Sequence, residues 1–215
     1  MEALTHCAGL LLAAGYSSRM GALKPLLRLH GRTLLEHATA SLFHGGVRDV
    51  YVVLGHRAAE IEADYAYRGQ VRVVYNASYD DGMFSSIQAG LRAVLAADAG
   101  YDAFFMLPGD HPFIEPGLLA ALDTAARDSG RGIVIPRYRG RNGHPCRISL
   151  RYAAEIAENE FSQGMKTLFA LHRDDILYLP TELPDILFDL DRPEDYQQAL
   201  RRTATKEERQ ECTPD

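Results

Sequence analysis

The chain contains 215 residues, of which 47% are hydrophobic and 24% are charged, and its formal net charge is −6. This composition is typical of a globular protein with one sizeable core. The negative charge argues against a nucleic-acid-binding protein, which normally presents a basic surface. The three cysteines, Cys7, Cys146 and Cys212, are too few and too scattered for a disulfide framework or a zinc site.

The first residues have no basic stretch ahead of their short apolar run, so we expect no signal peptide. No apolar run approaches the roughly 20 residues that a transmembrane helix needs. We therefore expect a cytoplasmic protein with neither a membrane nor a nucleic acid as its partner. No linker divides the chain, which predicts one domain over residues 1–203 and a polar C-terminal tail over residues 204–215.

Short apolar runs alternate along the chain with segments of helical spacing. The predicted strands cover residues 7–13, 49–55, 71–76, 101–108, 132–136, 146–150 and 175–180. The predicted helices cover residues 33–46, 58–69, 85–100 and 116–130, with Thr33 and Ser85 as candidate N-caps. Strands that are apolar throughout are typical of a parallel sheet covered on both faces. The order of elements predicts an α/β fold, a three-layer α/β/α Rossmann-like arrangement with a mostly parallel, mixed sheet.

The loop after the first predicted strand, AAGYSSRMGALK, contains two glycines and two cations. Ligands of such folds bind beyond the carboxyl ends of the strands. Gly15 and Gly21 would let backbone amides approach an anion, while Arg19 and Lys24 offer a planar fork and a compact charge for phosphate oxygens. The loop matches neither the dinucleotide fingerprint nor the P-loop. It therefore indicates a phosphate loop of another kind, and the alternative is a plain turn with solvated cations.

The segment LAAGYSSRMGALKPLL, residues 12–27, resembles the signature of the nucleotidyltransferases that complete the molybdenum cofactor, particularly the molybdopterin cytidylyltransferases. The pattern L-A-A-G-x-S-x-R-M-G-x-x-K is met from Leu12 to Lys24. The segment is more loosely similar to the sugar-phosphate nucleotidyltransferases and to the cytidylyltransferase of isoprenoid synthesis, which belong to the nucleotide-diphospho-sugar transferase superfamily. The resemblance continues in family order at residues 81–91, 107–114, 142–149 and 189–196.

This resemblance implies an Mg²⁺-dependent transfer of CMP from CTP to the phosphate of molybdopterin, with release of pyrophosphate. CTP is preferred to GTP because guanylyl relatives usually carry L-A-G-G where this chain has L-A-A-G. A molybdenum hydroxylase is a candidate recipient of the product. The alternatives are a guanylyl- or other nucleotidyltransferase acting on a different phosphorylated metabolite, and a non-catalytic chaperone that delivers the finished cofactor. A nicotinamide oxidoreductase is disfavoured because the dinucleotide fingerprint is missing.

Two acidic positions are candidate metal ligands. Asp110, in LPGDHP, follows a predicted strand and should lie at the same sheet edge as the first loop, where a carboxylate can hold Mg²⁺ against a triphosphate. A turn or capping aspartate is the alternative, and the resemblance implies the metal role. Asp191 is preferred to Asp189 as the second ligand. His111 stands where the cytidylyltransferases commonly have glutamine.

The remaining predicted site residues lie in the segments that carry the resemblance, which implies their roles. The expected catalytic residues are Arg19, Lys24 and Asp110, and the expected nucleotide-binding residues are Leu12, Ala13, Ala14, Gly15, Ser85, Ser86, Gly109 and His144. Ser85 and Ser86 begin a predicted helix whose amides could receive an anion, and a plain N-cap is equally compatible. His144, in the turn RGRNGHP, would either contact substrate or have only a structural role in the turn.

Overall fold

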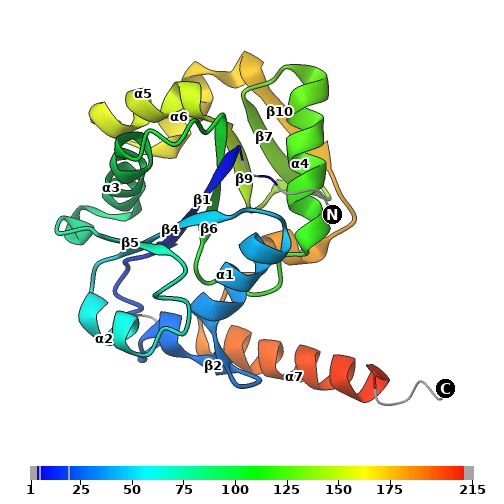
Figure 1. Cartoon of the computed structure of the whole chain (residues 1–215). Helices are drawn as coiled ribbons and strands as arrows, with labels where there is room; N and C mark the ends of the chain where they lie inside the picture. The colour runs from blue at the N-terminus through cyan, green and yellow to red at the C-terminus, as the bar shows by residue number, and fades with distance from the viewer. Residues whose placement is uncertain (1–3, 5, 19, 211–215) are drawn as a thin grey trace.

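The computed structural model describes residue 4, residues 6–18 and residues 20–210, with side chains described as far as residue 202. Its main sheet has the order β10-β7-β9-β6-β1-β4-β5 (Figure 1). Strand β9 is antiparallel to both β6 and β7, and the other neighbours along this path are parallel. The strands are β1 (Cys7–Ala13), β4 (Asp49–Leu54), β5 (Arg72–Tyr75), β6 (Ala103–Pro108), β7 (Ile133–Tyr138), β8 (Arg141–Asn142), β9 (Cys146–Ser149) and β10 (Ile176–Pro180). The prediction of a mostly parallel, mixed sheet is confirmed.

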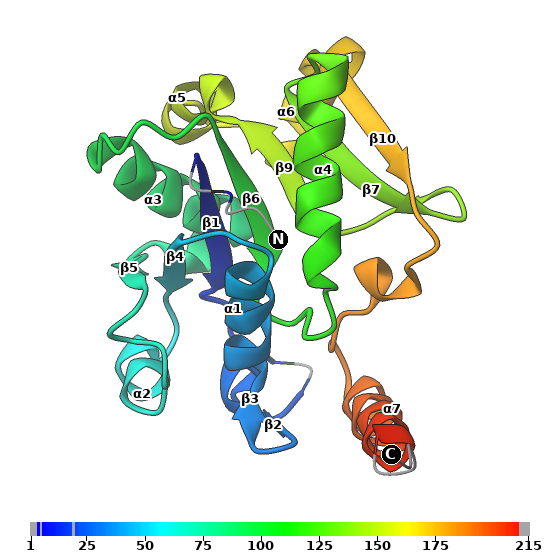
Figure 2. The same cartoon turned by 45° about the vertical axis from the view of Figure 1, so that its right-hand side comes forward.

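Helices cover both faces of this sheet (Figures 1 and 2). One core contains residues of α1 (Leu34–His44), α2 (Ala58–Ala63) and α4 (Pro116–Ser129). A second core, on the other face, contains residues of α3 (Met83–Ala96), α5 (Ala153–Glu158) and α6 (Met165–Leu171). The three central strands, β6, β1 and β4, are buried almost throughout, which explains why their sequences are continuously apolar.

The first two long helices begin in different ways. Helix α1 begins with the predicted cap: the Thr33 hydroxyl accepts from the Glu36 backbone N–H, and the Glu36 carboxylate accepts from the Thr33 backbone N–H in return. For α3 the prediction of a serine N-cap at Ser85 is wrong, because the helix begins at Met83 and Gly82 is its N-cap. Gly82 has a φ of 94°, a left-handed conformation that a glycine adopts without strain.

The C-terminal segment packs against residues from the first half of the chain. Leu190 and Ala199 pack with Leu29 and Leu34 in a small third core beneath the β2–β3 hairpin (Arg28–Leu29 and Arg32–Thr33). Helix α7 (Pro193–Gln210) lies beside this hairpin (Figure 1) and continues past residue 203, the predicted end of the domain. This packing brings the segment before α7 to the carboxyl edge of the sheet.

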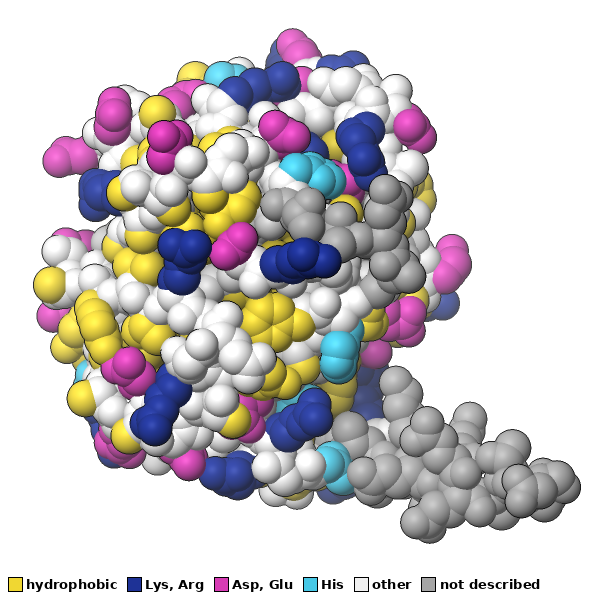
Figure 3. Space-filling model, in the orientation of Figure 1, with side chains coloured by type: hydrophobic (Ala, Val, Ile, Leu, Met, Phe, Trp, Pro, Cys, Tyr) yellow, Lys and Arg dark blue, Asp and Glu magenta, His cyan; other side chains and the backbone are white. Residues whose placement is uncertain are grey.

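The distribution of charged side chains on the surface is consistent with the negative net charge of the sequence. On the face shown in Figure 3, Lys and Arg side chains are interspersed with Asp and Glu, and this face presents no extended basic region. Among the described residues, no helix is long and apolar enough to cross a membrane.

Candidate active site

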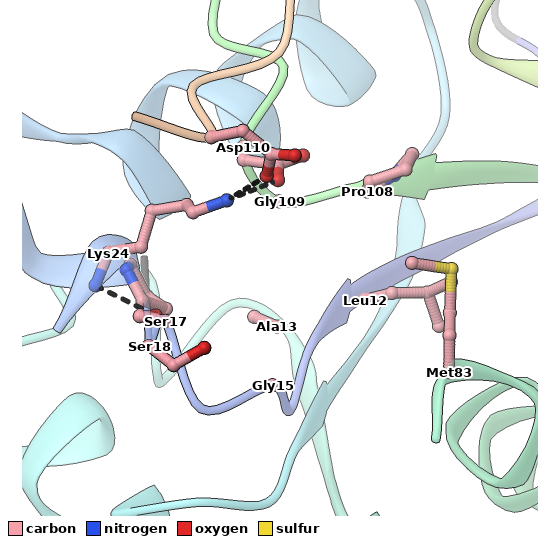
Figure 4. A pocket seen from close by; sticks show the side chains of 12 residues that line it. Leu12, Ala13, Gly15, Ser17, Ser18, Lys24, Met83, Pro108, Gly109 and Asp110 are labelled. Carbon is pink, nitrogen blue, oxygen red and sulfur yellow. Dashed lines mark hydrogen bonds and ion pairs between the residues drawn. The ribbon is translucent and has the colours of Figure 1, made fainter. Parts of the chain in front are cut away.

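A pocket of about 380 Å³ opens where β1 and β6 end (Figure 4). It is bounded by the loop after β1, the start of α3, the turn after β6 and the segment before α7. Its lining residues are Leu12, Ala13, Gly15, Ser17, Ser18, Lys24, Pro25, Met83, Pro108, Gly109, Asp110 and Asp191. The carboxyl ends of parallel strands are where ligands of such folds bind, so this pocket is the candidate active site.

The loop after β1 is shaped by its serine and glycine residues. Ser17 adopts a φ of 56°, and its hydroxyl accepts a 3.1 Å hydrogen bond from the backbone N–H of Lys24, which begins the 3₁₀ helix Lys24–Leu26. The backbone N–H of Met20 donates to the Ser17 carbonyl at 3.0 Å. A Cβ atom at Gly15 would meet nothing within 4 Å, so the backbone there is open to the pocket. Ser17 thus directs Lys24 toward the pocket.

Backbone contacts carry Asp110 to the same place. The Gly109 N–H donates to the Leu12 carbonyl at 2.8 Å, and a Cβ atom at Gly109 would lie only 3.1 Å from that oxygen. The glycine therefore lets the turn after β6 lie against the end of β1. The Asp110 carbonyl accepts from the Leu190 N–H at 3.2 Å, which places Asp191 beside Asp110.

Lys24 joins the two carboxylates. Its Nζ lies 2.9 Å from Asp110 Oδ2 and 2.8 Å from Asp191 Oδ1 (Figure 4 shows the Lys24 side chain reaching toward Asp110). Burial alone would lower the pKa of Lys24, but the two carboxylates raise it above its ordinary value. Burial would likewise raise the pKa of Asp110, but hydrogen bonds and charges from His111 and Lys24 lower it below its ordinary value. Both groups are therefore charged at neutral pH.

The donor set fits a divalent cation. Two carboxylate oxygens from distant parts of the chain converge on one positive charge, the Lys24 ammonium, which occupies the position of a cation between them. Hard cations such as Mg²⁺ and Mn²⁺ prefer oxygen ligands of this kind. Asp189, the alternative to Asp191, is exposed, whereas Asp191 lines the pocket.

The structure places most of the predicted loop residues together. Of these, Leu12, Ala13, Gly15, Lys24, Gly109, Asp110 and Asp191 line the pocket. Ala14 is buried beside them, and its carbonyl accepts from the His56 N–H at 3.1 Å. Arg19 lies outside the described residues, so its predicted role stays a prediction.

Ser85 and Ser86 belong to a hydrogen-bond network at the start of α3. The buried Asn76 side chain donates to both hydroxyls at 2.9 Å, and the Ser85 hydroxyl donates to the carbonyls of Ser78 and Gly82. Neither serine is among the residues that line the pocket. Their hydroxyls hold the end of β5 to α3, which positions the neighbouring Met83 at the pocket.

His144 lies behind Asp110 rather than in the pocket lining. Its ring meets the His111 ring edge-on, with centroids 5.1 Å apart, and His111 Nδ1 lies 3.0 Å from Asp110 Oδ1. Burial, with a smaller contribution from His111, lowers the pKa of His144 to about 4. His144 is therefore neutral at physiological pH.

Another cluster of side chains of the kinds that can bind a metal ion lies at the opposite edge of the sheet. His6, Cys7 and Asp123 come together there, but Asp123 also pairs with Arg127 at 2.8 Å and Arg147 at 3.1 Å. Burial and the nearby Asp123 carboxylate raise the pKa of Cys7 to about 12, so the thiol stays protonated. The two arginines already neutralise the carboxylate, and the group is better explained as a buried ion-pair network than as a metal centre.

The sequence interpretation missed several lining residues. Ser17, Ser18, Pro25, Met83 and Pro108 line the pocket but were not selected as site residues. Ser17 belongs to the loop signature and could have been found from it. Met83 and Pro108 carry no chemical signal, because backbone position alone brings them to the pocket.

The chain is similar to known proteins over most of its length. Residues 9–176 match the model of the MobA-like NTP transferase domain. The chain is 26% identical to the molybdenum cofactor cytidylyltransferase of Escherichia coli K12 over 90% of this chain and 95% of that protein. It is 31% identical to a probable molybdenum cofactor guanylyltransferase of Opitutus terrae, over 92% and 96%. It is 42% identical to nicotine blue oxidoreductase of Paenarthrobacter nicotinovorans, over 69% and 74%.

Solved structures show the same fold. A nucleotidyl transferase from Methanothermobacter superposes with a TM-score of 0.77 at 26% identity, covering 93% of this chain and 98% of that one. A Mycobacterium tuberculosis protein, Rv0371c, in complex with manganese superposes with a TM-score of 0.71 at 25% identity, covering 92% and 99%. The matched family model spans most of the chain, from β1 to the start of β10. The chain belongs to the family of MobA-like NTP transferase domains.

Proposed function

We propose that this protein transfers CMP from CTP to the phosphate of molybdopterin, with release of pyrophosphate and with Mg²⁺ as its cation. The observation that carries the proposal is the pocket in which Lys24 meets Asp110 and Asp191 beneath an open glycine loop. The relatives that act on the molybdenum cofactor support the choice of acceptor.

The chemistry needs positioning and charge compensation rather than a protein nucleophile. An oxygen of the acceptor phosphate attacks the α-phosphorus of the triphosphate, the new P–O bond forms, and the bond to the bridging oxygen breaks as pyrophosphate leaves. The acceptor phosphate is already ionised at neutral pH, so no general base is required. Lys24 compensates the charge that develops around the α-phosphate, and the amides near Gly15 hold phosphate oxygens. Arg19 is proposed to bind the departing pyrophosphate.

Asp110 and Asp191 would hold the divalent cation. When bound, the cation supplies Lewis-acid stabilisation of phosphoryl oxygens. The structural relative solved with manganese supports a divalent metal in this fold. The choice of CTP rests on the L-A-A-G sequence of the loop and on the cytidylyltransferase relative; the guanylyltransferase relative makes GTP the main alternative.

The test is a turnover assay of the purified protein with molybdopterin, Mg²⁺ and either CTP or GTP, followed by pyrophosphate release. We expect turnover with CTP and loss of turnover in Asp110→Asn, whereas Asp189→Asn is a matched control that stays active. Turnover with GTP alone would overturn the base assignment. Saturable binding of CTP without pyrophosphate release, in the presence of molybdopterin, would favour the cofactor-delivery chaperone.

A second candidate function is favoured by one observation, the 42% identity to nicotine blue oxidoreductase. Hydride transfer does not require two carboxylates that converge on a cation, and the first loop lacks the dinucleotide fingerprint. The same preparation should therefore be assayed for oxidation of NADH and NADPH with a dye acceptor. Rapid turnover there, abolished by neither Asp110→Asn nor removal of Mg²⁺, would replace nucleotidyl transfer as the activity.

A further inference from the structure

The two oxygens of Asp110 have different partners. Oδ2 accepts from Lys24 Nζ on the pocket side, at 2.9 Å, and Oδ1 lies 3.0 Å from His111 Nδ1. A carboxylate only accepts hydrogen bonds, so Nδ1 of His111 must carry the hydrogen. The His111 side chain is 7% exposed, whereas that of Asp110 is 22% exposed. The histidine thus holds the carboxylate from the protein interior and leaves the other oxygen toward the pocket.

The ring of His111 is held in turn by the loop before β9. The His144 ring meets it edge-on, with an interplanar angle of 78°. The His144 backbone N–H donates to the Ile186 carbonyl at 3.0 Å, and a Cβ atom at Gly143 would lie 2.5 Å from the same oxygen. Gly143 therefore allows the close approach that brings His144 against His111. The contact fixes the orientation of the ring that donates to Asp110.

We propose that His111 is a positioning residue for Asp110: it fixes the carboxylate rotamer so that Oδ2 faces the cation position in the pocket. Without the Nδ1–H donor of His111, the Asp110 carboxylate would rotate about χ2. Its Oδ2 atom would then no longer be held toward the pocket before a cation binds. An outer hydrogen-bond partner of a metal-binding carboxylate typically contributes 10- to 100-fold in metal affinity. The inference rests on the proposed function only in taking Asp110 as a ligand of the catalytic cation.

Two variants separate positioning from packing. His111→Phe keeps an aromatic ring and removes the donor, whereas His111→Gln keeps an amide donor. His44→Phe, at an exposed position on α1, is the matched control. The readouts are Mn²⁺ affinity measured by electron paramagnetic resonance in the presence of CTP, kcat and KM for CTP at several Mg²⁺ concentrations, and melting temperature.

We expect His111→Phe to weaken Mn²⁺ binding by about 10-fold or more and to lower kcat more than it changes KM for CTP. His111→Gln should recover most of the Mn²⁺ affinity, and His44→Phe should match the wild type. Wild-type Mn²⁺ affinity in a folded His111→Phe protein would overturn the proposal. So would equal losses in the Phe and Gln variants, which indicate packing alone.

Nitrogen NMR of the wild-type protein gives an answer that does not depend on any variant folding. The ¹⁵N shifts of the His111 imidazole should report hydrogen on Nδ1, and the Nε2–H tautomer would contradict the proposal. If no nucleotidyl transfer is found but Mn²⁺ binding falls in His111→Phe and recovers in His111→Gln, the positioning role stands and the proposed function fails. The two failures are therefore distinguishable.

Discussion

Lys24 joins the two carboxylates of the candidate site, Asp110 and Asp191. Its ammonium lies between two carboxylates, at the position that a divalent cation would take. Cation binding therefore competes with an internal positive charge unless a phosphate group draws Lys24 away. This arrangement predicts that metal binds better together with a nucleotide than alone, because the nucleotide gives Lys24 a new anionic partner.

The first prediction concerns Lys24→Met. We expect turnover to fall by about 10² to 10³, the usual cost of removing a group aimed at transition-state charge. We also expect the variant to bind Mn²⁺ alone more tightly than the wild type, because the competing ammonium is gone. Pyrophosphate release and Mn²⁺ titration measure the two effects.

Lys166→Met is the control for this prediction, since Lys166 is exposed on α6 and does not line the pocket. A Lys24→Met protein with unchanged or weaker affinity for Mn²⁺ alone would show that Lys24 does not occupy the metal position in solution.

The second prediction concerns pH and His144. Its folded pKa of about 4 lies below the ordinary value near 6.5, so the unfolded chain binds more protons between these two pH values. The free energy of unfolding should therefore fall as pH drops from about 6.5 to about 4, and this contribution should be fully present above that window. Urea denaturation at several pH values should show a flatter profile for His144→Gln than for the wild type.

The control for the pH prediction is His44→Gln, at an exposed position. It should keep the wild-type slope between about pH 4 and 6.5. If His144→Gln and the wild type lose the same free energy of unfolding across that window, His144 is not held neutral by the fold.

At the scale of elements, the close packing of α3 against the sheet requires a glycine at one position. A Cβ atom at Gly90 would lie 2.2 Å from Leu10 Cδ1 and 2.8 Å from Val53 Cγ2, so the helix packs directly on β1 and β4. Helix propensity alone would favour alanine there by about 0.5–1 kcal/mol. The close approach outweighs this preference because both contacted side chains are fully buried.

The third prediction compares two glycines in helices. Gly90→Ala should lower the free energy of unfolding by about 1–3 kcal/mol through overpacking. Gly117→Ala, in the first turn of α4 where a Cβ atom would meet nothing within 4 Å, should leave stability unchanged or raise it by a few tenths of a kcal/mol. Urea denaturation measures both, and a Gly90→Ala protein at least as stable as the wild type would contradict the packing argument.

At the scale of the whole molecule, the pocket joins segments that are far apart in the sequence. The loop after β1, the turn after β6 and the segment before α7 all contribute side chains to it. A ligand that contacts all three should stabilise the folded chain as a unit. Saturation at about 100 times the dissociation constant would add about 2.7 kcal/mol to the free energy of unfolding.

The fourth prediction is a ligand-dependent melting temperature. CTP with Mg²⁺ should raise the melting temperature more than either component alone, and NADH should have no effect. Lys24→Met should lose most of the joint effect while its own melting curve stays cooperative. Stabilisation by NADH and none by CTP would support the oxidoreductase alternative.

The sequence alone determined the layers of the fold and pointed to the loop after β1 as a candidate site. Continuously apolar runs predicted the central strands, because parallel strands covered by helices bury both faces. The loop signature predicted Gly15 and Lys24 as site residues, because phosphate chemistry selects glycine and cations within a few consecutive residues. The N-cap at Thr33 was likewise predicted, because a hydroxyl residue directly before a segment of helical spacing is a local signal.

Only the tertiary structure decided how distant residues combine. It brought Asp191, the candidate preferred from the sequence, to the pocket beside Asp110, because the Leu190 N–H donates a hydrogen bond to the Asp110 carbonyl. It placed Ser85 and Ser86 in a network with Asn76 and moved the start of α3 to Met83. It also set His144 against His111 behind the Asp110 carboxylate. Such contacts join segments that are distant in the sequence, and local spacing carries no information about them.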